Sequence, residues 1–167
     1  ILMQQSITQK NQESVSVTVV IVTYNSAETI WECLNSLSNQ TFQAFDVVLI
    51  DNFSKDATRA AVDSFKETAD FTLNCVYLNE NMGFARGNNI ALEKTSSSLI
   101  VLLNPDAKAD KYWLHHLVST MNQHPEVGIC GSKLLNWDRS MVDSAGDVML
   151  STLRAFKGGE GKNPQDF

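Results

Sequence analysis

An alternation of short apolar runs with amphipathic segments along residues 15–130 is the feature that most constrains the fold. The first run, residues 15–22, is almost continuously apolar and β-branched, which is typical of a strand buried on both faces. Three further runs span residues 47–50, 73–78 and 99–103. Segments with a helical spacing of apolar residues follow them. This alternation predicts an α/β fold whose mainly parallel sheet is flanked by helices.

The helices are expected to begin soon after these strands. The first is predicted to have Asn25 or Ser26 as its N-cap, because short polar side chains there accept hydrogen bonds from the free N–H groups of the first turn. Further helices are predicted from about residue 56, over 84–94 and over 111–123, followed by a short strand near 127–130.

Composition narrows the classes of function. A formal net charge of -6 argues against a nucleic-acid partner or an anionic membrane surface, since both need a positive field. No run approaches the ~18 apolar residues of a membrane-spanning helix. The cysteines, Cys33, Cys75 and Cys130, form no C-x-x-C pair, which disfavours a zinc site and predicts buried, reduced thiols in a cytoplasmic compartment.

Polar side chains follow all four predicted strands. They are Thr23 and Asn25, Asp51 and Asn52, Asn79 and Asn81, and Asn104 and Asp106. Ligands of open parallel sheets bind outside the carboxyl ends of the strands. The phosphate-binding patterns G-x-G-x-x-G after the first strand and G-x-x-x-x-G-K-[ST] are both absent. The carboxylate after the second strand could instead accept hydrogen bonds from a base or ribose, and the one after the fourth could hold Mg²⁺ or Mn²⁺.

Four stretches at these strand ends resemble the family 2 glycosyltransferases, especially the bacterial rhamnosyltransferase and galactofuranosyltransferase-like branch. They are VTVVIVTYN (17–25), VVLIDNFSKD (47–56), LNENMGFARGNNIAL (78–92) and LIVLLNPDA (99–107). They match in order and spacing and cover residues 17 to about 135. The resemblance implies a GT-A (Rossmann-like) fold, of which this chain is the nucleotide-sugar-binding half.

The resemblance also implies which residues surround the nucleotide base. These are Thr23, Tyr24, Asn25, Asp51, Asn52 and Ser54. The first three would line the base, partly through backbone groups. Asp51 would accept a hydrogen bond from the imide N–H of uridine or thymidine, with the last two nearby.

The diphosphate and the metal are assigned in the same way. The segment from Gly83 to Asn89 would lie alongside the diphosphate and ribose. Gly83 would allow the backbone to approach them closely, and Arg86 would lie nearby. Asp106 would bind the Mg²⁺ or Mn²⁺ that bridges the diphosphate. The family usually has a second aspartate where this chain has Asn104, whose amide oxygen is a poorer ligand, so Asp106 is expected to be the sole protein carboxylate on the metal.

Structural alternatives to these assignments remain open. Asp51 and Asp106 could each serve as a turn or helix cap, and Arg86 and Asn89 could be solvated helix residues. Trp137 could pack at the rim of the fold or border the sugar pocket.

The resemblance implies an inverting transfer of a hexosyl or rhamnosyl group from a dTDP- or UDP-sugar. The acceptor would be a glycan or a lipid-linked intermediate in cell-surface polysaccharide synthesis. The general base is expected beyond residue 167, so this fragment alone would lack it. Two alternatives stay open: a non-catalytic module that binds nucleotide-sugars, and a sugar nucleotidyltransferase.

The expected organisation has three parts. Residues 1–14 are polar and are interpreted as a disordered leader or cloning remnant. Residues 15–135 form the nucleotide-sugar-binding domain, and residues 136–167 begin an acceptor-side region that is truncated. The full-length protein is expected in the cytoplasm, with peripheral association at the cytoplasmic face of the membrane.

Overall fold

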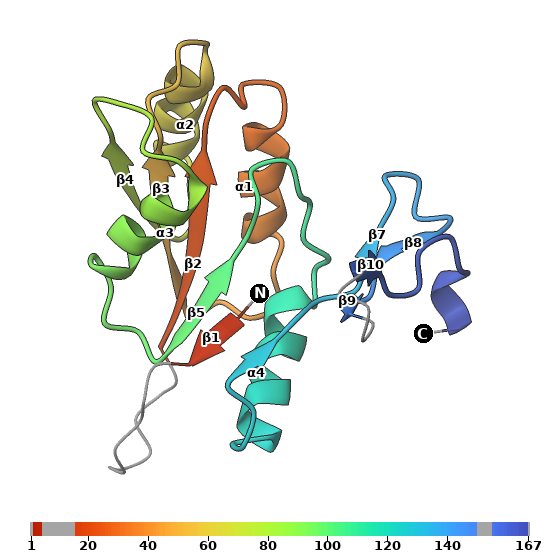
Figure 1. Ribbon diagram of the computed structural model, residues 1–167. Coiled ribbons are helices and arrows are strands. Elements are labelled where there is room, and N and C mark those ends of the chain that lie inside the picture. The colour runs from red at the N-terminus through yellow and green to blue at the C-terminus, as the bar shows by residue number, and fades with distance from the viewer. Residues whose placement is uncertain (1, 5–15, 150–154, 167) are drawn as a thin grey trace. The chain divides into compact units, whose positions relative to one another are not determined.

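The computed structural model describes residues 2–4, 16–149 and 155–166 (Figure 1). The chain divides into two compact units, one over Leu2–Gly128 and the other over Ile129–Phe167. The boundary predicted from the sequence lies after residue 135, whereas this division of the chain falls after Gly128.

The first unit is built on a mainly parallel sheet, as predicted. Its strands lie in the order β4-β3-β2-β5-β1. The parallel strands are β2 (Val17–Thr23), β3 (Phe45–Asp51), β4 (Thr72–Tyr77) and β5 (Leu99–Leu102). β1 (Leu2–Gln4) pairs antiparallel with β5, so the expectation of an unstructured leader is wrong for these three residues. The remainder of that leader lies outside the described residues.

Four helices flank this sheet: α1 (Ile30–Ser38), α2 (Thr58–Lys66), α3 (Phe84–Leu92) and α4 (Trp113–Gln123). Figure 1 shows α3 on one face of the sheet and α1 and α2 on the other. α1 begins later than predicted, because Asn25 has a left-handed φ of 50° and the carbonyl of Ser26 accepts the N–H groups of Thr29 and Ile30 in a preceding turn. None of the helices in the described ranges has the length and apolar character needed to cross a bilayer.

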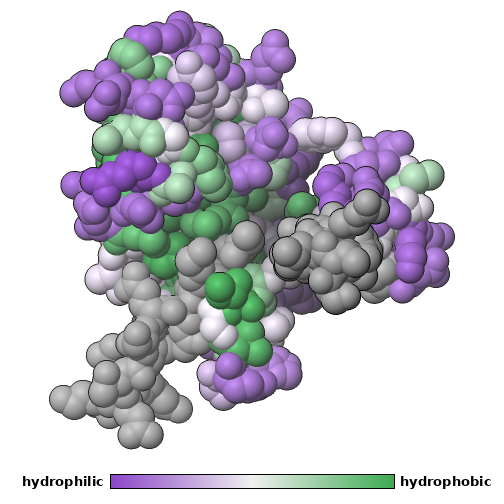
Figure 2. All heavy atoms as spheres, in the orientation of Figure 1, coloured by the Kyte–Doolittle hydropathy of each residue, from purple (hydrophilic) through white to green (hydrophobic). Residues whose placement is uncertain are grey.

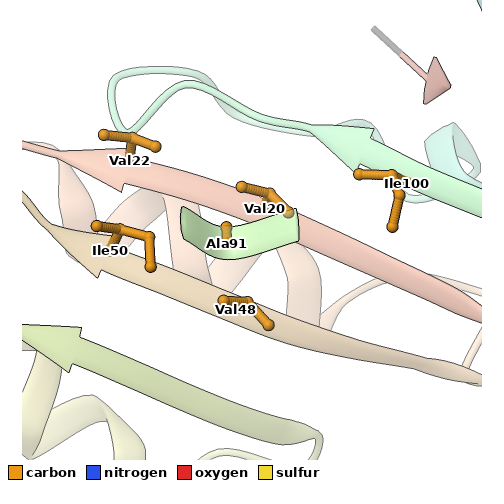
Figure 3. Packing of buried hydrophobic residues seen from close by; sticks show 6 residues of the cluster. All are labelled: Val20, Val22, Val48, Ile50, Ala91 and Ile100. Atoms are coloured by element: carbon orange, nitrogen blue, oxygen red, sulfur yellow. The ribbon is translucent and has the colours of Figure 1, made fainter. Parts of the chain in front are cut away.

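The core under α3 explains why the strands are so apolar. Val20 and Val22 of β2 lie beside Val48 and Ile50 of β3, and Ala91 of α3 packs over them (Figure 3). Strand residues alternate between the two faces of a sheet. The intervening residues Val19, Ile21, Val47 and Leu49 are also fully buried, so both faces are covered and the strands show no polar alternation.

The second unit is formed from short strands. They are β6 (Ile129–Cys130), β7 (Leu134–Leu135), β8 (Val142–Ser144), β9 (Asp147–Met149) and β10 (Ala155–Lys157), and a 3₁₀ turn spans Pro164–Asp166. β7 pairs antiparallel with β8, and β9 with β10. The strand predicted near residues 127–130 is therefore present, whereas the later strands carry no periodic sequence pattern.

Candidate functional site

The predicted site residues of the first three strands meet at one edge of the sheet. Thr23 is in register with Asp51, and Asp51 with Tyr77, so the ends of β2, β3 and β4 are level. Hydrophilic residues gather over this end of the unit, toward which the parallel strands point in Figure 1 (Figure 2). This is the edge at which parallel sheets bind ligands.

A hollow of the first unit lies at the opposite edge. It has a volume of about 610 Å³ and is lined by residues such as Val17, Phe45 and Thr72, which begin their strands. Its position at the amino ends of the strands argues against a role in binding the predicted nucleotide.

Asp51 is a buried carboxylate held by one neighbouring residue. It is 3% exposed. Its Oδ2 accepts the N–H of Ser54 at 3.3 Å, and its Oδ1 accepts the hydroxyl of Ser54. A buried carboxylate is costly unless hydrogen bonds compensate it. Ser54 provides two such bonds and leaves further lone pairs on both oxygens free to accept from a ligand.

Asn25 joins the loop after β2 to the loop after β3. Its N–H donates to Ser54 Oγ at 3.0 Å, and its Oδ1 accepts the N–H of Lys55 at 2.8 Å. Asn25 and Phe53 both have left-handed backbones, with φ of 50° and 71°. Such conformations persist where surrounding contacts over-determine them, and they concentrate at functional sites.

Asp56 makes a second connection between the same loops, which sequence reasoning missed. Its Oδ2 accepts the N–H of Ala27 at 3.1 Å, and its Oδ1 accepts the N–H of Thr58 at 3.0 Å. The hydroxyl of Thr58 in turn accepts the N–H of Ser26 at 2.7 Å. The Thr58 hydroxyl also donates to Asp56, and this bond is the main cause that lowers the pKa of Asp56. The Asp-x-Thr spacing before a helix was the available signal, since both side chains favour helix starts.

Asn52 shapes the loop between β4 and α3. It is 3% exposed, and its Nδ2 donates to Asn81 Oδ1 at 2.9 Å. Its Oδ1 accepts the N–H of Met82 at 2.8 Å, while Asn81 Oδ1 also accepts the N–H of Gly83. Each end of the Asn52 amide thus makes one bond within the fold, so the side chain positions the loop between β4 and α3.

The residues from Gly83 to Asn89 differ in burial: some pack within the fold and others are exposed. Gly83 is the N-cap of α3 with φ of 80°, a conformation that glycine adopts without strain. Arg86 and Asn89 are exposed. Gly87 is buried, and a Cβ there would lie 2.7 Å from Cγ1 of Val22, so it permits close packing of α3 on β2. Asn88 donates to the carbonyl of Phe84 in its own helix at 2.9 Å.

Thr23 and Tyr24 differ in exposure. Tyr24 is 47% exposed at the end of β2. Thr23 is fully buried, and its Oγ1 has no hydrogen-bond partner among the described residues. An unsatisfied buried hydroxyl is unfavourable, and a polar group of a bound ligand would relieve it.

The loop after β5 carries the predicted metal ligands. Asn104 and Asp106 are both exposed. The thiol of Cys33 donates to the carbonyl of Asn104 at 3.4 Å. Burial raises the pKa of Cys33 to about 12, and the charge of Asp106 adds to this effect, so Asp106 lies within electrostatic reach of α1. The described residues contain no group of three His, Cys, Asp or Glu side chains that could hold a metal alone.

Two acidic residues of the second unit are bonded to neighbouring residues. Asp143 accepts two bonds from Lys157 Nζ, at 2.8 and 3.0 Å. Hydrogen bonds from Ser140 lower the pKa of Asp138. A general base at neutral pH needs a raised pKa, so Asp138 does not suit that role as it stands.

Comparisons with known proteins agree with this geometry. The model of the family described as Glycosyl transferase family 2 matches residues 18–136. The chain is 32% identical to the glycosyltransferase AglE of Haloferax volcanii over 108 residues. These residues make up 64% of this chain and 35% of that protein. It is 32% identical over 122 residues to the uncharacterized glycosyltransferase YfnE of Bacillus subtilis, which is 72% of this chain and 30% of that protein.

Two solved structures share the fold of the first unit. The mannosyltransferase PcManGT from Pyrobaculum calidifontis, in complex with GDP-Man and Mn²⁺, matches with a TM-score of 0.61 and 32% identity over 63% of this chain and 32% of that one. TarS of S. aureus, in complex with UDP-GlcNAc, matches with a TM-score of 0.60 and 28% identity over 66% of this chain and 32% of that one. The chain spans about a third of the length of these relatives.

Proposed function

Because the chain belongs to glycosyltransferase family 2, we propose that it is the donor-binding part of an enzyme that transfers a sugar from a dTDP- or UDP-sugar. Its parallel sheet flanked by helices has the GT-A fold. The acceptor is a glycan or lipid-linked intermediate in cell-surface polysaccharide synthesis, at or near the cytoplasmic face of the membrane. The nucleotide-sugars bound to the structural neighbours support a donor of this class.

The observation that carries the proposal is the buried carboxylate of Asp51 at the carboxyl edge of the sheet. Ser54 donates to both of its oxygens, so the group is held as an acceptor. The imide N–H of uracil or thymine would donate to a remaining lone pair. Tyr24 and the unsatisfied hydroxyl of Thr23 lie on the adjacent strand end and would complete the base site.

The diphosphate would lie between α3 and the loop after β5. Gly83, Arg86 and Asn89 would contact it, with the guanidinium supplying a positive charge. Asp106 and Asn104 offer the oxygen ligands that Mg²⁺ and Mn²⁺ prefer, and one carboxylate suits a metal whose shell is completed by phosphates and water. When bound, the metal would stabilise the negative charge that develops on the leaving diphosphate.

The proposed reaction inverts the configuration at the anomeric carbon of the donor sugar. The acceptor hydroxyl attacks that carbon in line with the departing nucleoside diphosphate. The new glycosidic bond forms as the bond between the anomeric carbon and the phosphate oxygen breaks, and a carboxylate base outside these residues takes the acceptor proton. This chain binds the base through Asp51 and orients the diphosphate through Asp106 and Arg86. The sugar transferred is a hexosyl or rhamnosyl group.

Calorimetric titration of the chain with UDP, dTDP and GDP, each with and without Mn²⁺, tests the proposal. We expect metal-dependent binding of UDP or dTDP. Asp106→Ala should abolish the metal dependence, and Asp51→Ala should weaken binding in both conditions. Asp46→Ala is the matched control, because it removes the same charge from an exposed position on β3 near the opposite edge. If none of the three nucleotides binds, the proposal is wrong.

A further inference from the structure

Three buried polar side chains of α1 and the residues just after it face the loop that joins β5 to α4. Cys33, Ser36 and Gln40 are 1%, 4% and 2% exposed. Their spacing of three and four residues places them along one side of the helix. We call these three residues the α1 row. Ser36 and Gln40 lie in none of the four motif stretches, and the sequence predicts only a buried thiol at Cys33.

The first two members bond the backbone on either side of Asp106. The Cys33 thiol donates to the carbonyl of Asn104 at 3.4 Å. Ser36 Oγ accepts the N–H of Ala109 at 3.0 Å while its own hydroxyl donates to the carbonyl of Cys33 at 2.6 Å. Asp106, the proposed metal ligand, therefore lies between two points at which α1 holds the chain.

Gln40 holds the end of the same loop. Its Nε2 donates to the carbonyl of Asp110 at 2.7 Å, and its Oε1 accepts the N–H of Leu114 in the first turn of α4 at 2.9 Å. Next to it, Thr41 donates both its N–H and its hydroxyl to the carbonyl of Lys111, at 2.9 and 3.2 Å. Between Leu102 and Trp113 the chain forms no helix or strand, so these side chains take over bonds that regular structure would otherwise make.

We propose that Cys33, Ser36 and Gln40 are positioning residues, which hold the loop so that Asp106 meets the metal and diphosphate of the donor. This inference rests on the proposed function. It predicts that the row affects the part of nucleotide affinity that depends on the metal. Contacts to the base, which depend on the loops after β2 and β3, should be unaffected.

The test uses the ratio of the nucleotide dissociation constants without and with Mn²⁺, measured by calorimetry with whichever of UDP, dTDP or GDP the unsubstituted chain binds. The variants are Ser36→Ala, Gln40→Met and Cys33→Ala. Cys33→Ser retains a donor toward Asn104 and is the conservative partner of the last. Val62→Ala is the control, because it removes buried core volume on α2, a helix that contains no residue of the row or the loop.

We expect each row variant to lower this ratio by about 3- to 10-fold, as the loss of one or two hydrogen bonds implies, with little change in metal-free affinity. Cys33→Ser should keep the ratio. Amide exchange at Ala109 and Leu114 should accelerate in Ser36→Ala and Gln40→Met respectively. Val62→Ala should lower the Tm and leave the ratio unchanged.

An unchanged ratio in Ser36→Ala and Gln40→Met, or an equal fall in Val62→Ala, would overturn the inference while leaving the proposed function in place. If the unsubstituted chain binds nucleotide without any metal dependence, or binds none, the proposed function itself fails in its metal or donor assignment, and the inference fails with it.

Discussion

Replacing Gly87 with alanine tests whether the glycine at the start of α3 is needed for close packing of this helix on β2. The added Cβ would lie 2.7 Å from Cγ1 and 3.2 Å from Cγ2 of Val22, where carbon atoms prefer about 3.5–4.0 Å. Either α3 moves away from β2 or Val22 leaves its rotamer, at a cost of about 1–3 kcal/mol. Helix propensity offsets about 1 kcal/mol of this. We therefore expect Gly87→Ala to lower the free energy of unfolding by about 1 kcal/mol.

The clash can be removed from the other side. In a Val22→Ala background both offending methyl groups are absent, so the same glycine substitution should become neutral or stabilising by up to about 1 kcal/mol. Urea denaturation of the four members of this double-mutant cycle measures the coupling, which we expect to exceed about 1 kcal/mol. Gly128→Ala is the control, because a Cβ there meets nothing within 4 Å. Additive effects, or a Gly87→Ala chain as stable as the original, would refute the packing argument.

Two further predictions concern the loops at the carboxyl edge. Asn52→Ala removes the acceptor of the Met82 N–H and one of the two donors to Oδ1 of Asn81, so the free energy of unfolding should fall by about 1–3 kcal/mol, and nucleotide affinity should fall with or without Mn²⁺. Urea denaturation and calorimetry measure these two effects, and an unchanged affinity would contradict the positioning role. The pKa of Asp56 is lowered in the fold, so its contribution to stability is complete above about pH 4 and is lost as the pH falls through the lowered pKa. The Tm difference between the chain and Asp56→Asn should accordingly shrink in acid, and a difference that does not vary with pH would count against this role.

The sheet was predictable because its central strands are buried on both faces. β2 and β3 are continuous apolar runs for that reason, and the mainly parallel arrangement follows from the alternation with helices, whereas the strand order was not predicted. Capping residues were a weaker guide to where a helix begins, because contacts with distant loops can decide its first residue. The start of α1 was predicted at Asn25 or Ser26, but Asn25 uses its side chain to bind Lys55 in another loop, and the helix begins at Ile30.

The second unit was hardest to predict. Its strands have two or three residues each, which is too short for any periodicity to appear. β1 was missed for a related reason, since Leu2–Gln4 pairs with β5 across a large sequence separation and has no flanking pattern of its own.

Polar residues at strand ends have two tasks that the sequence does not distinguish. The loops there lack regular structure, so side chains must satisfy much of their backbone as well as meet a ligand. Asn25, Asn52 and Asp56 bond the backbone of neighbouring loops, and for Asn52 both ends of the amide are used in the fold.

We therefore expect ligand binding to depend on groups that the fold leaves able to accept or donate. Asp51 is held by Ser54 but keeps acceptor capacity. Arg86 and Asp106 are exposed beside loops whose backbones are fixed from elsewhere. A polar residue of this edge is thus better assigned by asking which of its hydrogen-bonding groups the loops already use than by its position in a motif. Substitutions at Asn25, Asn52 or Asp56 should alter loop order and affinity together, whereas a substitution at the exposed Asp106 should alter affinity alone.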